Sequence, residues 1–112
     1  MNKEYYFLGE EIALQEVKPD LHRKVVARGG DMMIVEVHFK KGAVGDMHAH
    51  IHEQVTYCKS GSVEFDIEGE KQIIKAGDSV FMPINCLHGC VALEDNTVLL
   101  DIFTPQRLDF LV

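Results

Sequence analysis

Three histidines and a glutamine in this sequence have the side-chain types and the spacing of a metal site. His48 and His50 are separated by one residue, so both imidazoles project from the same face if this segment is a β-strand. His88 lies on a later segment, and Gln54 could add an oxygen ligand from just beyond a turn. Because neutral imidazole is the commonest metal ligand in proteins, the sequence predicts a divalent cation bound by His48, His50, Gln54 and His88.

Two cysteines and a further histidine lie close enough in sequence to join this site. Cys86 and Cys90 flank His88 at two residues on either side, so all three could share one strand face. A thiolate is a reasonable ligand for a borderline-soft metal, but packing as small buried side chains explains the same cysteines. His52 belongs to the histidine-rich run, and the expected turn directs it away from the metal. The remaining histidines and cysteine have no partner in the pattern and are expected to be structural: His22, His38 and Cys58.

A second group of reactive side chains follows later in the chain. Asp101 occurs on an apolar, strand-like segment, where a carboxylate is costly to bury unless it is paired, protonated or beside a metal. A carboxyl group with a pKa raised in this way suits acid–base catalysis. Arg107 follows Pro105, and its planar guanidinium suits a bidentate contact with a carboxylate. A structural ion pair between Asp101 and Arg107, or a cap on the end of the sheet, is the alternative interpretation.

Short strands separated by turns must position these side chains. The strand-like segments are rich in apolar, β-branched or aromatic residues and are bounded by turn residues. They are residues 32–39, 47–50, 54–59, 62–68, 71–75, 79–82, 87–93 and 97–103. No stretch of about 12 residues combines helical periodicity with helix caps. The spacing therefore predicts an all-β sandwich or barrel, with a jelly roll among the expected solutions.

The composition restricts the partners and the compartment. A net charge of −7 makes nucleic acid or an anionic membrane surface a poor partner. An acidic substrate then needs local positive charge from a metal or an arginine. Three cysteines are too few for a disulfide framework, which favours a reducing cytoplasm. The first residues lack the apolar core of a signal peptide, and no apolar run is long enough to span a bilayer.

Two motifs in order resemble the cupin superfamily. They are Gly42-x5-His48-x-His50-x3-Gln54-x6-Gly61, with glutamine at the usual glutamate position, and Gly77-x5-Pro83-x4-His88. Asn85 and Ala92 stand where glycine and asparagine are more usual in the second motif. The resemblance implies a double-stranded β-helix, or jelly-roll barrel, with a metal inside one end. The chain is expected to be a single cupin domain over residues 1–112, with a core at about 30–103, N-terminal strands within 1–30 and a tail at 104–112.

The glutamine at position 54 has an electrostatic consequence. A carboxylate ligand would cancel one positive charge of the metal, whereas an amide cancels none. The cation then keeps a stronger field for an anionic ligand, and for polarising bound water or a carbonyl oxygen. Gln54 therefore favours an acidic substrate.

Both groups of residues together resemble a narrower family, the small bacterial pectin-degradation cupins of the KdgF type. The resemblance rests on His48-Ala-His50-Ile-His52-Glu-Gln54 and on Asp101-x-Phe103-x-Pro105-x-Arg107-x-Asp109-Phe110. It implies conversion of 4,5-unsaturated monouronates, which are products of pectin or alginate breakdown, to linear keto forms. By position it implies the four metal ligands above, Asp101 as the acid–base residue, Arg107 on the substrate carboxylate and Phe103 in the pocket. No redox step is needed, so the metal could be zinc, nickel, iron or manganese.

Other functions fit the same motifs, because small cupins share them across many activities. An iron-dependent oxygenase acting on a small organic substrate would tolerate three histidines and a neutral ligand. A non-catalytic sugar-binding cupin and an enzyme whose substrate is not a uronate are further alternatives. Apolar residues on both faces of segment 97–103 and the aromatic run at 5–7 predict a homodimer, since one small domain leaves such surface uncovered.

Overall fold

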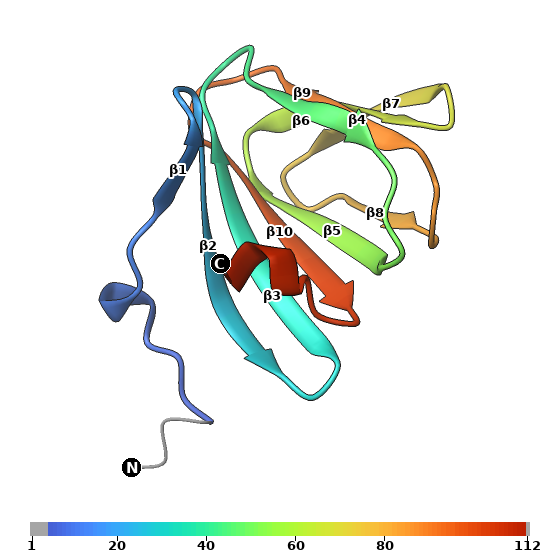
Figure 1. Ribbon diagram of the computed structural model, residues 1–112. Helices are drawn as coiled ribbons and strands as arrows, with labels where there is room; N and C mark the ends of the chain where they lie inside the picture. Colours follow the sequence, from blue (N-terminus) through green and yellow to red (C-terminus); the bar gives the residue numbers. More distant parts are fainter. Residues whose placement is uncertain (1–4, 112) are drawn as a thin grey trace.

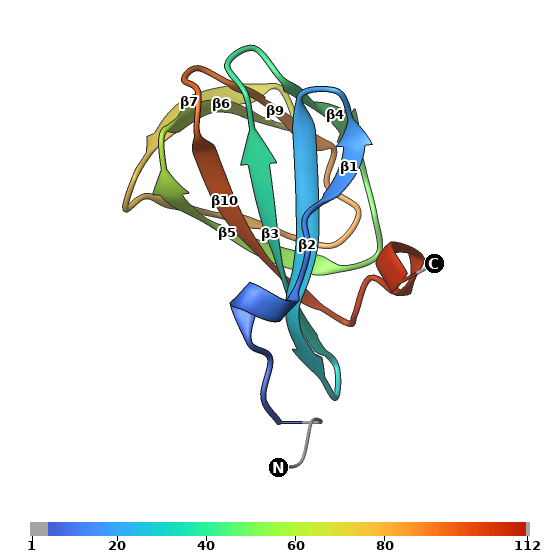
Figure 2. The same ribbon diagram turned by 90° about the vertical axis from the view of Figure 1, so that its left-hand side faces the viewer.

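Two antiparallel β-sheets face each other in a computed structural model that describes residues 5–111 (Figure 1). The larger sheet has the strand order β1 (Gln15–Lys18), β2 (Leu21–Gly29), β3 (Met32–Phe39), β10 (Thr97–Thr104), β5 (Glu53–Ser60) and β8 (Ser79–Met82). The smaller sheet has the order β4 (Val44–His48), β9 (His88–Ala92), β6 (Ser62–Ile67) and β7 (Glu70–Lys75). Figure 2 shows β2, β3 and β10 side by side in the larger sheet. The expected all-β jelly roll is confirmed, as a sandwich of two sheets rather than a closed barrel.

Alternating apolar side chains build the core between the two sheets. On β3 every second side chain is buried, and its neighbour β10 contributes Leu99 and Phe103. In the opposite sheet, β6 contributes Val63 and Phe65. This period of two is what a strand with one core face requires. Asp101 shares the parity of Leu99 and Phe103 and therefore faces the interior of the sandwich.

Most predicted strands agree with the observed ones, and the differences are at their ends. Residues 32–39 and 79–82 are strands with the predicted bounds, and Pro83 follows the end of β8. The hairpin turn between β6 and β7 lies at Glu68 and Gly69, one residue earlier than expected. Both residues have positive φ, 52° and 86°, which matches the twist of the flanking strands and which glycine adopts without steric cost.

The prediction that residues 47–50 form one strand is wrong. β4 spans Val44–His48, so His50 follows the strand instead of sharing its face. The carbonyl oxygen of His50 accepts a hydrogen bond from the backbone N–H of Asn85 (2.7 Å), outside the pairing of β4 with β9. The strand-parity argument for His48 and His50 therefore fails, and the loop after β4 must aim the second ring.

Two short 3-10 helices accompany the strands, η1 (Gly9–Glu11) and η2 (Leu108–Leu111). Within residues 5–111, no helix is long and apolar enough to cross a membrane. η2 follows β10 and returns toward β2, where it lies beside the space between the sheets (Figure 1). The last described residues therefore contribute to one wall of that space.

Candidate functional site

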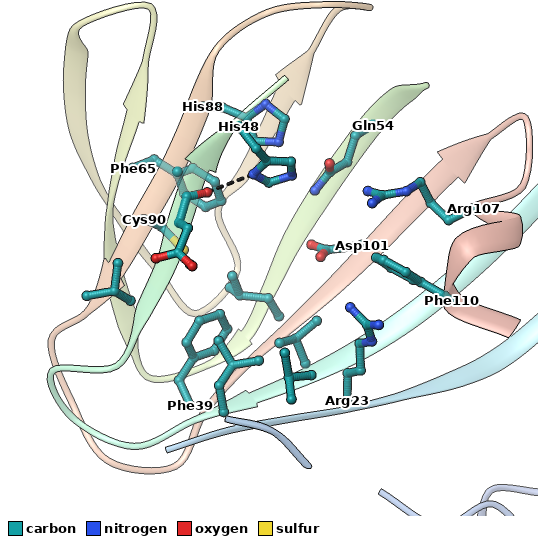
Figure 3. A pocket seen from close by; sticks show the side chains of 18 of the residues that line it. Arg23, Phe39, His48, Gln54, Phe65, His88, Cys90, Asp101, Arg107 and Phe110 are labelled. Carbon is teal, nitrogen blue, oxygen red and sulfur yellow. Dashed lines mark hydrogen bonds between the residues drawn. The ribbon is translucent and has the colours of Figure 1, made fainter. Parts of the chain in front are cut away.

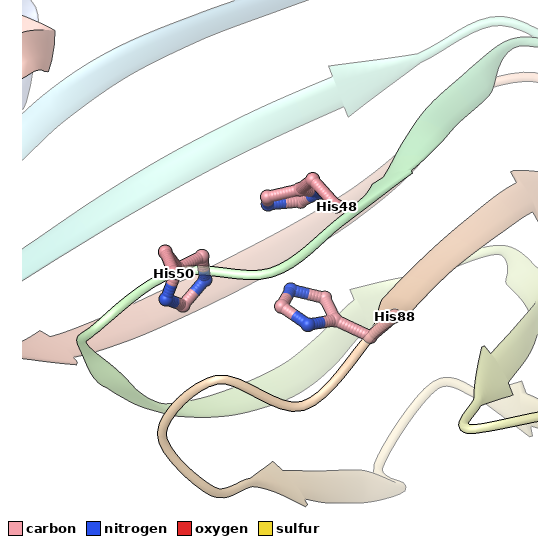
Figure 4. Close-up of side chains that lie close together, drawn as sticks. All are labelled: His48, His50 and His88. Atoms are coloured by element: carbon pink, nitrogen blue, oxygen red, sulfur yellow. The ribbon is translucent and has the colours of Figure 1, made fainter.

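The side chains of His48, His50 and His88 converge at one end of the sandwich (Figure 4). One ring nitrogen of each lies within 4.8 Å of the others, and the ring centroids are 4.4 to 5.2 Å apart. His48 ends β4 and His88 begins β9, and the two residues are paired in register. His50 reaches the same point from the loop that follows β4. The structure thus brings together the three histidines that the sequence singled out.

Hydrogen bonds to the backbone fix the tautomer of each imidazole. Every Nδ1–H donates to a nearby carbonyl oxygen: His48 to Asp46 (2.7 Å), His50 to His52 (3.0 Å) and His88 to Cys86 (3.0 Å). A carbonyl oxygen only accepts, so the hydrogen of each neutral ring is on Nδ1 and the lone pair is on Nε2. Nε2 of His88 is buried and has no hydrogen-bond partner among the described residues. Metal-ligating histidines are oriented in this way, and a cation would satisfy the unpaired nitrogen.

Burial keeps the rings of His50 and His88 neutral near pH 7. It lowers the pKa of His50 to about 4, although a hydrogen bond with Gln54 favours the charged form. Burial also lowers the pKa of His88. Neutral imidazole is the form that binds metal, so no proton has to leave these rings first.

Gln54 joins the cluster from β5 in the larger sheet. Its side chain is buried and places Oε1 at 3.0 Å from Nε2 of His50. At its other end, Nε2 of Gln54 donates to Oγ1 of Thr56 (2.9 Å), which in turn donates to Oδ1 of Asp101 (2.7 Å). Because the hydroxyl gives its one hydrogen to Asp101, it can only accept from Gln54, and this determines which end of the amide faces His50. Two lone pairs therefore face each other at 3.0 Å, an arrangement that a shared cation would stabilise.

The close approach of β4 and β9 sets the distance between His48 and His88. A Cβ atom on Gly89 would lie 2.8 Å from the carbonyl oxygen of Gly45 and 3.0 Å from the amide nitrogen of Met47. A larger residue at position 89 would push the backbone of β4 away, because a packed strand cannot yield locally. Gly89 therefore contributes to the site although it offers no ligand.

The other candidate ligands lie outside the histidine cluster. Cys86 is buried with its Sγ 3.8 Å from Nδ1 of His88, the nitrogen that already binds the backbone. Burial raises the pKa of Cys86, and it raises that of Cys90 to about 12, so both remain thiols. His52 packs near His50, with ring centroids 5.3 Å apart, but the metal-binding group found among residues 5–111 does not include it.

A cavity of about 260 Å³ extends from the histidine cluster into the space between the sheets (Figure 3). This volume is at the small end for ligand pockets and suits a monosaccharide-sized molecule. Asp101 and Phe103 of β10 line it. Burial raises the pKa of Asp101 to about 6, although hydrogen bonds from Thr56 and Gln54 favour its charged form. The Asp101 carboxyl group can therefore accept and release a proton near neutral pH.

Arg107 lines the same cavity, but it pairs with Asp109 rather than with Asp101. Its Nε and Nη2 donate to the two carboxylate oxygens of Asp109 (3.0 and 2.9 Å), and this bond lowers the pKa of Asp109. Its guanidinium carbon also lies over Phe110 of η2, 4.2 Å from the ring centroid. No ion pair joins Asp101 to Arg107 in the part of the chain that the structure describes, so the alternative interpretation of a structural pair is not supported.

Arg23 is a candidate that reasoning from the sequence missed. It lies on β2 and lines the cavity, with its guanidinium carbon 3.7 Å from the ring centroid of Phe110. In Figure 3 the guanidinium groups of Arg23 and Arg107 lie on opposite sides of that ring. One feature of the sequence could have identified it. Arg23 alternates with the apolar residues Leu21 and Val25, so all three side chains lie on the same face of the strand, which faces the core.

Comparisons with known proteins agree with the architecture. The family model described as a cupin domain, Cupin_2, matches residues 35–103. The pectin degradation protein KdgF of Dickeya dadantii (strain 3937) is 46% identical over 107 residues, which cover 95% of this chain and 97% of that protein.

Two solved structures are similar over almost the whole chain. KdgF from Halomonas sp. superposes with a TM-score of 0.90 at 40% identity, covering 94% of this chain and 98% of the other. An RmlC-like cupin from Shewanella frigidimarina NCIMB 400 gives a TM-score of 0.89 at 34% identity, covering 95% of both chains. The chain therefore belongs to the cupin domain family, as its two motifs predicted, and is a small cupin similar to KdgF.

Proposed function

We propose that this protein is a metal-dependent enzyme that converts 4,5-unsaturated monouronates to their linear keto forms. The observation that carries the proposal is one monosaccharide-sized cavity that joins histidines of the cluster, a carboxyl group with a raised pKa and two guanidinium groups. Similarity to KdgF proteins, one of which is named for pectin degradation, supports a substrate derived from an acidic polysaccharide.

Four side chains would hold the metal ion: His48, His50 and His88 through Nε2, and Gln54 through its amide oxygen. The unpaired Nε2 of His88 and the facing lone pairs of His50 and Gln54 fit such an ion. Imidazole ligands favour zinc, nickel or iron over magnesium or calcium, and manganese is also compatible. When bound, the ion supplies positive charge that stabilises negative charge developing on a substrate oxygen.

Arg107 would hold the carboxylate of the substrate. One edge of its guanidinium binds Asp109, and its remaining N–H groups are available on the side of the cavity. Phe103 lies beside it, with the guanidinium carbon 5.3 Å from the ring centroid, and would pack against the sugar ring. These contacts would convert binding into orientation of the reacting bond.

Asp101 would move the proton that the isomerisation requires. In the cyclic substrate, the hydroxyl on C1 loses its proton, the bond between C1 and the ring oxygen breaks, and C1 becomes an aldehyde. The electron pair of that bond remains on the ring oxygen, and protonation of C4 turns the resulting enol system into a ketone at C5. One carboxyl group that first accepts and then donates a proton balances this reaction without another reactant.

The proposal is tested with purified, metal-loaded protein and an unsaturated galacturonate released by a pectate lyase. We expect the ultraviolet absorbance of the conjugated double bond to disappear faster than in the spontaneous reaction. Absence of acceleration with zinc, nickel, iron and manganese contradicts the proposal. Asp101→Asn is expected to remove most of the acceleration while metal remains bound, and a full rate would contradict only the role of Asp101. Oxygen uptake with substrate loss would indicate an oxygenase instead.

We also propose that the protein is a homodimer of the cytoplasm. The outer face of the larger sheet exposes Val55, Tyr57 and Phe81, and a second copy of the chain would cover this apolar surface. The three cysteines are free, as in proteins of a reducing compartment. Gel filtration with light scattering should give twice the monomer mass, and Phe81→Glu should shift it to the monomer.

A further inference from the structure

We infer that Arg23 forms a carboxylate subsite together with Arg107, so that the acidic end of the ligand lies against Phe110 and away from the histidine cluster. The inference rests on the proposed function for the identity of the substrate. Its physical basis is separate, because it depends on a guanidinium group that faces the cavity and pairs with no anion in the part of the chain that the structure describes.

Arg23 is a half-buried cation whose donors meet no acceptor among residues 5–111. Within residues 5–111 it makes no ion pair and no side-chain hydrogen bond. Burial, and then the like charge of Arg107, lowers its pKa, against the opposing attraction of Asp109. The guanidinium of an arginine stays charged under these conditions, so its free N–H groups are available to an incoming acceptor.

Arg107 is less available to a ligand than Arg23, because Asp109 occupies one edge of its guanidinium group. The Nε and Nη2 atoms that would give a bidentate contact already bind the two oxygens of Asp109. Only its remaining N–H groups can reach a ligand while this bond persists. No described residue occupies the N–H groups of Arg23, and the planar pair of N–H groups on a guanidinium matches the geometry of a carboxylate.

Phe110 holds the two guanidinium groups in place. Their carbons lie 3.7 Å (Arg23) and 4.2 Å (Arg107) from its ring centroid, a distance at which cation–π attraction restrains both side chains. The stacking leaves the in-plane N–H groups of Arg23 available for an anion. A carboxylate held here would therefore meet a cation that is oriented before binding, which lowers the entropic cost of the contact.

The position of this subsite defines how a uronate would lie. In Figure 3, Arg23 and Arg107 are at one end of the cavity, His48 and His88 are at the other, and Asp101 lies between them. With the carboxylate at the arginine end, the sugar ring would extend along the cavity toward Asp101 and the histidine cluster.

The experiment compares two sugars that differ in charge. Metal-loaded protein is titrated with D-galacturonate and with D-galactose, and binding is followed by NMR chemical shifts. For Arg23→Gln we expect the dissociation constant for galacturonate to rise roughly tenfold or more, because a charge-assisted contact is lost, while that for galactose stays unchanged. Arg28→Gln is the matched control, since Arg28 lies on the same strand outside the cavity, bonded to Gln106. Arg23→Lys should recover part of the preference for galacturonate.

Two results would overturn the subsite directly: no preference of the native protein for galacturonate over galactose, or an unchanged galacturonate affinity in Arg23→Gln. An equal loss of affinity for both sugars in Arg23→Gln would also overturn it, because Arg23 would then only support Phe110. The proposed function fails separately. If galacturonate binding depends on Arg23 but the unsaturated uronate is not turned over, the subsite stands and the reaction is wrong. If Arg23→Gln turns over the unsaturated uronate with an unchanged KM, the reaction stands and the subsite is wrong.

Discussion

The hydroxyl group of Thr56 connects the proposed acid–base residue to the proposed metal ligands, and Thr56→Val removes that group while keeping the shape of the side chain. Thr56 is completely buried. Its Oγ1 accepts from Nε2 of Gln54 at 2.9 Å and donates to Asp101 at 2.7 Å. The substitution leaves both partners unsatisfied, and it frees the amide of Gln54 to turn its oxygen away from His50.

The size of the effect follows from these two hydrogen bonds. An unsatisfied buried group costs about 1–3 kcal/mol, so the free energy of unfolding should fall by roughly 1–5 kcal/mol after the added methyl group offsets about 0.8 kcal/mol of the loss. Of the two hydrogen bonds, only the one with Gln54 should affect the metal affinity. Loss of such an outer contact lowers metal affinity by about 10- to 100-fold, equivalent to roughly 1.4–2.8 kcal/mol.

A competition assay with a zinc-binding dye measures the affinity, and chemical denaturation measures the stability. Thr56→Ser is the control, because it keeps the hydroxyl and loses one methyl group. We expect Thr56→Ser to be destabilised by about 1 kcal/mol with native zinc affinity. If Thr56→Val bound zinc as tightly as the native protein, Thr56 would not control the orientation of Gln54 and the reasoning would be refuted.

Three further predictions concern the metal, a thiol and a surface ion pair. Chelation should lower the melting temperature of metal-loaded protein, since a metal present at 100 times its dissociation constant stabilises the fold by about 2.7 kcal/mol. Calorimetry measures this shift, and it should be absent in His88→Ala. Burial raises the pKa of Cys90 to about 12, so iodoacetamide at pH 8 should alkylate it far more slowly in the folded protein than in urea; equal rates would show that the thiol is accessible. The hydrogen bond from Arg107 lowers the pKa of Asp109, so the stabilisation is fully present above the ordinary carboxyl pKa of 3.8 and is lost as the pH falls through the lowered value. Asp109→Asn should therefore have a lower denaturation midpoint than the native protein at pH 7, and the difference should shrink in acid; a constant difference would exclude an electrostatic origin.

The strands and the grouping of the three histidines could be predicted because both leave local patterns. Strand segments such as 62–67 alternate in polarity, and turn residues separate them, so single-residue periodicity locates them. His50 is an instructive case. It lies in the predicted cluster, but the strand geometry used to justify it is wrong, because pairing with β9 ends at His48. The motif spacing contained the information that the parity argument lacked.

The remaining parts of the site depend on contacts between distant segments, which no local pattern encodes. Arg23 meets Phe110 only because β2 lies in the same sheet as β10, whose continuation returns across the cavity. Thr56 looks like an ordinary strand residue until its neighbours Gln54 and Asp101 are placed. In the sequence, nothing distinguishes Gly89 from the other eight glycines. Its role in spacing the two strands follows only from the backbone of β4 passing beside it.

The boundaries of the family match suggest how a cupin of this kind could change the small molecule that it binds. The matched region, residues 35–103, contains the three histidines, Gln54 and Asp101, whereas Arg23, Arg107 and Phe110 all lie outside it. The shared domain thus contains the proposed reaction centre. The two segments that flank it contain the proposed subsite for the negative charge of the ligand. Evolution could replace those flanks to alter which small molecule is admitted without disturbing the metal ligands. For the same reason, grafting both flanks onto another small cupin would be the economical route to an engineered preference for acidic sugars.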